Sequence, residues 1–109
     1  MEKPQKGYQE RCYYHDLKDG CVSICQPKNG VCLTIDFDAE QLDCFVEWKM
    51  MGIRDYVLGL ECGNCYPDGR NIMREKGILK FLAPDSSINN RVKISLDKTG
   101  RKENVSNIE

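Results

Sequence analysis

The sequence predicts an all-β protein with an antiparallel β-sandwich fold, and three observations support this fold class. Apolar and polar residues alternate along most of the chain, whereas the spacing typical of an amphipathic helix is nearly absent. Turn-forming residues separate the alternating segments at intervals typical of antiparallel sandwiches. The chain has 109 residues, of which 40% are hydrophobic and 30% charged, so it can form one domain around one core.

The first part of the chain is expected to form three strands. Residues 8–17 make the first strand, which ends at the turn sequence KDG at 18–20. Residues 21–26, CVSICQ, and residues 31–37, VCLTIDF, both alternate. The Asn-Gly pair at 29–30 between them is a strong signal for a β-hairpin.

The rest of the chain is expected to add four strands after one helical turn that Asp38 caps. Residues 44–51, CFVEWKMM, and residues 56–62, YVLGLEC, alternate clearly. Residues 77–82 and residues 91–96 complete the set of about seven strands.

Composition excludes several classes of function. The net charge of −1 and the pI near 5.9 argue against a nucleic-acid or anionic-membrane partner. No apolar run is long enough to cross a bilayer, and no apolar N-terminal segment marks secretion.

Seven cysteines, an odd number, favour free thiols in a reducing cytoplasm over a disulfide framework. We therefore expect a cytoplasmic single domain over 1–109 without a cofactor, with 98–109 as a frayed tail.

Glu61 is the candidate with the clearest chemistry. In a strand over 56–62, Glu61 shares one face with Val57 and Gly59, while the opposite face is apolar and belongs to the core. A glycine inside a strand gives up packing, and the close approach of a ligand is one reason to keep it. A carboxylate at such a place can act as a general base. Spacing alone favours the simpler interpretation that Glu61 is a solvent-facing surface residue.

The CGNC sequence at 62–65 is a rival signal. A structural zinc site needs four ligands and usually a second pair of this spacing, which Cys21 and Cys25 do not provide. A redox pair needs its first cysteine at a helix N-terminus, whereas residues 66–69 are typical of a turn. Two ordinary thiols are favoured, and a metal or thiol protein using Cys62 and Cys65 stays a third hypothesis.

A resemblance to a known family covers about residues 8–97 of the chain. Residues 45–87 resemble the C-terminal part of the galactose mutarotase (aldose 1-epimerase) superfamily, closest to a poorly characterised bacterial branch. The shared features are a Trp-Lys strand, a Gly-Leu-Glu strand, a loop with Pro and Gly-Arg, and a strand introduced by Gly and Leu. The most specific segment is YVLGLECGNCYPDGR at 56–70.

The resemblance implies a β-supersandwich with a sugar-binding cleft on one concave sheet and an aldose 1-epimerase activity. Glu61 matches the general base, which takes the proton from the anomeric hydroxyl while an acid protonates the ring oxygen. The ring opens and closes again to give the other anomer. The implied sugar-binding residues are Glu10, Trp48, Lys49, Asn64 and Arg70.

Several of these residues have simpler explanations. Trp48 can pack in the core instead of lining a cleft. Lys49 is more typical of a solvated surface lysine, and Arg70 of a surface ion pair with Asp68. The single histidine, His15, matches no family position and is expected to be exposed or hydrogen-bonded for structural reasons.

The resemblance also implies an incomplete site, because family members are longer and carry further sugar ligands in their N-terminal part. The chain is therefore expected to be a C-terminal fragment that keeps the base strand. Its exposed sheet edges are expected to pair with the missing part or with a second copy. The alternative function is a carbohydrate-binding module without turnover.

Overall fold

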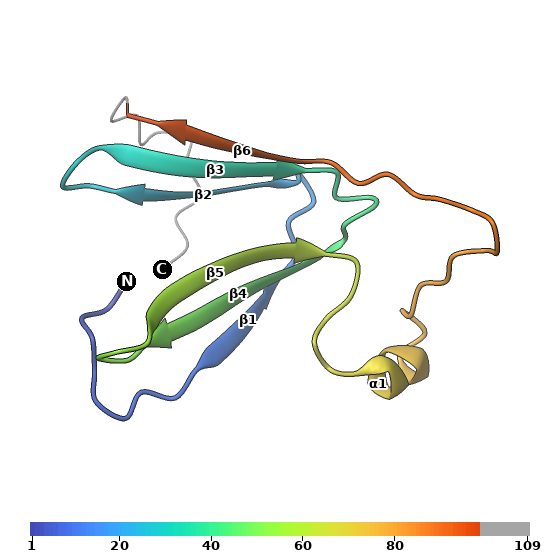
Figure 1. The fold of residues 1–109 in the computed structure, drawn as a ribbon, viewed down its shortest axis with the longest axis horizontal. Helices are drawn as coiled ribbons and strands as arrows, with labels where there is room; N and C mark the ends of the chain where they lie inside the picture. Colours follow the sequence, from blue (N-terminus) through green and yellow to red (C-terminus); the bar gives the residue numbers. More distant parts are fainter. Residues whose placement is uncertain (99–109) are drawn as a thin grey trace.

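Two three-stranded antiparallel sheets form the fold of the computed structural model, which describes residues 1–98 (Figure 1). The first sheet has the order β1-β4-β5, with bounds Arg11–His15, Cys44–Met51 and Tyr56–Gly63. The second sheet has the order β2-β3-β6, with bounds Cys21–Gln26, Val31–Phe37 and Val92–Asp97. One short helix, α1 (Arg70–Glu75), lies between β5 and β6. The predicted all-β antiparallel sandwich is confirmed.

The core lies between the two sheets. Val22 and Ile35 of the second sheet and Phe45 of the first are buried and form one apolar cluster. The rings of Phe37 and Phe45 stack at 6.0 Å between centroids and join the two layers. Burial of these side chains is the main contribution to holding the sheets together. Partly buried side chains surround the cluster: Leu17, Leu33, Phe37, Leu60 and Cys62.

Strand register divides the first sheet into two faces. Phe45 lies opposite Cys62 on the inner face, which turns toward the second sheet. Trp48 lies opposite Gly59, and Val46 lies opposite Glu61. Because opposed residues in an antiparallel pair share a face, these last four positions occupy the outer face. The predicted alternation along β5 is therefore confirmed.

The hairpin between β2 and β3 forms where the Asn-Gly pair predicts it. The Gly30 amide donates to the carbonyl of Gln26 over 3.0 Å, and Gly30 has the positive φ of 69° that favours glycine. The turn after β3 is closed by the Leu42 amide, which donates to the Asp38 carbonyl over 2.8 Å, and the Asp38 side chain caps it, since its Oδ1 accepts the Glu40 amide over 2.9 Å. The predicted bounds of β2, β3 and β4 match the structure, whereas the first strand is shorter than predicted.

The strand predicted over 77–82 is absent, and this prediction is wrong. Gly77 instead ends α1 in a Schellman motif, with its amide bonded to the Arg74 carbonyl and the Ile78 amide bonded to the Met73 carbonyl. Gly77 has a φ of 71°. The buried Met73 side chain holds the helix against the domain. The chain then extends to β6 without joining either sheet.

One further expectation changes. Cys25 and Cys32 lie opposite each other on the β2–β3 hairpin and form a disulfide, so the expectation of free thiols is wrong for this pair. The other five cysteines are free.

Within residues 1–98, no helix has the length and apolar character needed to span a membrane. The predicted tail lies outside the described residues, apart from Lys98.

Candidate functional site

Glu61 lies exposed on the outer face of the first sheet, directly over Gly59. Its Oε1 stands 2.5 Å from the position that a Cβ at Gly59 would occupy. The glycine thus leaves the space that the carboxylate fills. Within residues 1–98, Glu61 has no hydrogen-bond or ion-pair partner, so both carboxylate oxygens are available to a ligand.

Trp48 borders the same space. Its Cβ lies 3.4 Å from the Cβ position at Gly59, and its indole Nε1 donates to Glu10 Oε2 over 2.8 Å. Trp48 is half-buried, so part of the indole remains open to solvent. Glu10 comes directly before β1, Trp48 from β4 and Glu61 from β5, so three predicted residues meet on one face. We call these three residues the Glu61 face.

Tyr14 extends this face on β1, and sequence reasoning did not single it out. It lies opposite Val46, which lies opposite Glu61 in the next strand. Its hydroxyl donates to Asp68 Oδ1 over 2.7 Å, and this hydrogen bond raises the pKa of Tyr14 to about 12. The Tyr66 ring stacks on Tyr14 at 4.3 Å between centroids. The sequence does contain a signal that Tyr14 lies on this face, because Tyr14 and Glu10 fall on the same side of an alternating segment.

Asn64 and Arg70 belong to a different hollow, of about 360 Å³, beneath the loop that follows β5. The Asn64 carbonyl accepts a hydrogen bond from Lys80 Nζ over 2.9 Å. Tyr66 lines this hollow as well and connects it to Tyr14. Asn64 and Arg70 are therefore neighbours of the Glu61 face and not part of it.

Asp68 forms the hydrogen bond with Tyr14 and an ion pair with Lys76 at 3.9 Å. The surface ion pair expected between Asp68 and Arg70 does not form among the described residues.

Lys49 lies on the opposite side of the sheet from Trp48. Its side chain is buried at 8% exposure, and its Nζ pairs with Glu2 Oε1 at 3.1 Å. The hydrogen bond to Glu2 raises the pKa of Lys49. The expectation of a solvated lysine is wrong because the residue next to Trp48 in a strand faces the interior layer.

His15 also lies on the inner face, where its Nε2 forms a hydrogen bond with Glu47 Oε1 at 3.1 Å. The prediction of a structural, hydrogen-bonded histidine is confirmed.

The two cysteines of the CGNC sequence occupy unrelated surroundings. Cys62 packs against the core on the inner face, and burial raises the pKa of its thiol. Cys65 is exposed in the loop after β5. Within the part of the chain that the structure describes, no three His, Cys, Asp or Glu side chains are grouped so that they could hold a metal ion.

Comparisons with known proteins identify the family of this chain and nothing further. Neither the curated proteins nor the solved structures contain a match to this chain. Over residues 1–96 the chain matches, and therefore belongs to, the family described as Domain of unknown function (DUF4432).

Proposed function

We propose that the Glu61 face binds an aldose and that Glu61 catalyses exchange between its two anomers, as the resemblance to the mutarotase superfamily implies. The observation that carries this proposal is the placement of an exposed carboxylate, unpaired within residues 1–98, beside a half-buried indole on the outer face of the first sheet. Indole rings offer an apolar platform for the C–H face of a sugar. Carboxylates accept hydrogen bonds from sugar hydroxyls.

Glu61 takes the proton from the anomeric hydroxyl in this proposal, and the ring then opens. Glu10 fixes the orientation of the Trp48 indole and offers a second acceptor for sugar hydroxyls. The single histidine of the chain lies on the inner face, so water is the proposed source of the proton for the ring oxygen. A general base alone accounts for roughly 10²–10⁴-fold of rate, so a modest catalyst is expected.

Polarimetry of freshly dissolved α-D-glucose and α-D-galactose tests the activity. The rate above the uncatalysed background should fall to that background in Glu61→Gln. Glu75→Gln is a matched control, because Glu75 is exposed on α1 and is not part of the Glu61 face. Equal rates for the wild type and Glu61→Gln would remove Glu61 from the reaction.

A carbohydrate-binding face without turnover is the second candidate. It is favoured by the hydrogen bond between Trp48 and Glu10, which holds an aromatic platform in place whether or not a proton moves. Saturation-transfer NMR with the same aldoses separates the candidates. Binding without rate enhancement supports the second candidate, and the absence of binding removes both.

A further inference from the structure

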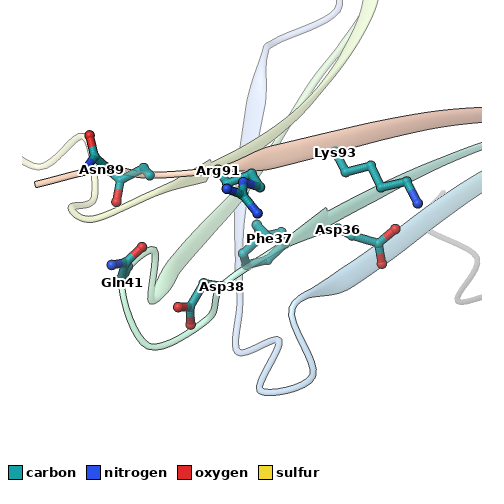
Figure 2. Close-up of a pocket in the computed structure, with 8 residues that line it drawn as sticks. Asp36, Phe37, Asp38, Gln41, Asn89, Arg91 and Lys93 are labelled. Carbon is teal, nitrogen blue, oxygen red and sulfur yellow. The ribbon is translucent and has the colours of Figure 1, made fainter.

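A separate hollow of about 540 Å³ lies at one end of the second sheet, where β3 ends and β6 begins (Figure 2). Its volume falls within the range of small-molecule sites. Glu61 does not line it. The walls come from the end of β3, the turn that follows, and the chain around the start of β6, and include Asp36, Phe37, Asp38, Asn89, Arg91 and Lys93.

Backbone hydrogen bonds hold the walls in place. Asp36 lies opposite Lys93 in the β3–β6 register, and Phe37 lies opposite Val92. The Phe37 amide donates to the Gly20 carbonyl over 2.8 Å. Asp38 Oδ1 accepts the Glu40 amide over 2.9 Å, which fixes the direction of this carboxylate. The hollow is thus built on a sheet end and a closed turn.

The charges in the hollow cancel. Two carboxylates, Asp36 and Asp38, come from the β3 side, and two cations, Arg91 and Lys93, come from the β6 side (Figure 2). Within residues 1–98, neither cation forms an ion pair, although both share the hollow with acids. The side-chain amide of Asn89 has no hydrogen bond in this part of the chain either. Donors and acceptors therefore remain available at short range.

We propose that this hollow binds a neutral saccharide of one or two rings. Sugar hydroxyls both donate and accept, so they can bond the carboxylates and the basic and amide groups at once. Phe37 lines the hollow as well, and because its ring stacks on Phe45 in the core, only its exposed edge offers an apolar contact for the sugar ring. An anionic ligand would meet Asp36 and Asp38, and a cationic ligand would meet Arg91 and Lys93. The site is distinct from the Glu61 face and does not depend on its function.

Methyl α-D-glucopyranoside and maltose are the probes, added to the ¹⁵N-labelled full chain and followed by two-dimensional NMR. The methyl glycoside cannot change its anomer, so binding is measured apart from any reaction. We expect amide shifts in 36–41 and 89–93. Asp38→Asn and Arg91→Gln should each weaken binding at least about tenfold, the effect of losing one hydrogen bond to a charged group.

The matched control is Arg54→Gln, which removes an exposed arginine in the β4–β5 turn and should leave the affinity unchanged. Asparagine at 38 can still accept the Glu40 amide, so the turn should keep its fold, and the NMR spectrum verifies this. Glu61→Gln should bind both probes at this hollow as the wild type does.

Shifts confined to the Glu61 face, or tighter binding of glucose 6-phosphate or glucosamine than of the neutral probes, overturn the proposal.

Discussion

The carboxylate of Glu61 occupies the space that a side chain at Gly59 would fill, with Oε1 2.5 Å from the Cβ position. The two residues lie on the same face of β5, two positions apart. The absence of a side chain at one position therefore sets where the acid at the other can lie. Trp48 closes the space from the neighbouring strand.

Gly59→Ala should displace the Glu61 carboxylate without unfolding the domain. The added methyl group would meet the far end of a flexible side chain, which can rotate away. Alanine is also about 0.5–1 kcal/mol better than glycine inside a strand. We expect the anomer-exchange rate to approach that of Glu61→Gln, with an unchanged or higher melting temperature.

Gly63→Ala is the control for this substitution. Its Cβ would lie 3.7 Å from the Cys65 carbonyl oxygen, an ordinary contact on the same face of β5. Its rate should equal that of the wild type. A folded Gly59→Ala variant with full activity contradicts the placement of the base.

Tyr14 should make stability fall at high pH. Its hydrogen bond to Asp68 raises the pKa from 10.0 to about 12, because the neutral phenol is the donor. The contribution of this hydrogen bond to the free energy of unfolding is complete below the pKa of Tyr14 in the unfolded chain. It is lost as the pH rises through the pKa in the folded chain, because the tyrosine of the unfolded chain ionises first. The stability gap between the wild type and Tyr14→Phe in urea should therefore stay constant up to about pH 9 and shrink between about pH 10 and about pH 12. A gap that stays constant across that upper range contradicts the Tyr14–Asp68 bond.

Local patterns predicted most of the fold. Alternation and the Asn-Gly pair located β2, β3 and β4, because both signals act between neighbouring residues. Helix α1 was missed because six residues show too little periodicity, and its stability depends on the tertiary burial of Met73. Gly77 was interpreted as the start of a strand, because a glycine that ends a helix and a glycine that precedes a strand look alike in sequence.

The Glu61 face was predicted in part. Alternation placed Glu61 and Gly59 together, and the same rule places Trp48 away from Lys49. The Tyr14–Asp68 hydrogen bond joins residues 54 positions apart, so no local pattern contains it. The burial of Lys49 depends on Glu2, which is 47 positions away. Such pairs become visible only when the strand order is known.

The disulfide between Cys25 and Cys32 can be tested by counting free thiols. Thiol titration of the denatured, unreduced chain should find five thiols, and the reduced chain should show seven. Closing so short a loop should stabilise the fold by about 2 kcal/mol, so reduction should lower the midpoint of urea unfolding. The double variant Cys25→Ser/Cys32→Ser should match the reduced protein. Seven thiols before reduction would restore the expectation of free cysteines.

The His15–Glu47 pair should show strong coupling in a double-mutant cycle. Glu47 is only 3% exposed, and its Oε2 is buried without a hydrogen-bond partner among residues 1–98. His15→Leu removes the partner of Oε1 and should cost about 1–3 kcal/mol of unfolding free energy. His15→Leu/Glu47→Leu should recover much of this loss, because two apolar residues can pack beside Phe45 and Leu60. Additive losses in urea unfolding would show that the pair is not coupled.

Strand β6 should drive self-association. Its inner face carries Ile94 and Leu96 at 67% and 73% exposure, although Ile35 opposite Ile94 is 7% exposed. Within residues 1–98, β6 is also an edge strand of its sheet (Figure 1). Antiparallel pairing of two copies about Ser95 would set Ile94 of one against Leu96 of the other and extend the sheet.

Size-exclusion chromatography at several concentrations should therefore show a concentration-dependent dimer. Ile94→Thr/Leu96→Thr should shift it to monomer while costing less than about 1 kcal/mol, since exposed side chains contribute little to folding. Ile35→Thr is the contrast, because the same change at a buried position should cost about 2 kcal/mol or more. A wild type that stays monomeric at every concentration means that the exposed row on β6 does not associate with a second copy, and the edge then needs another explanation.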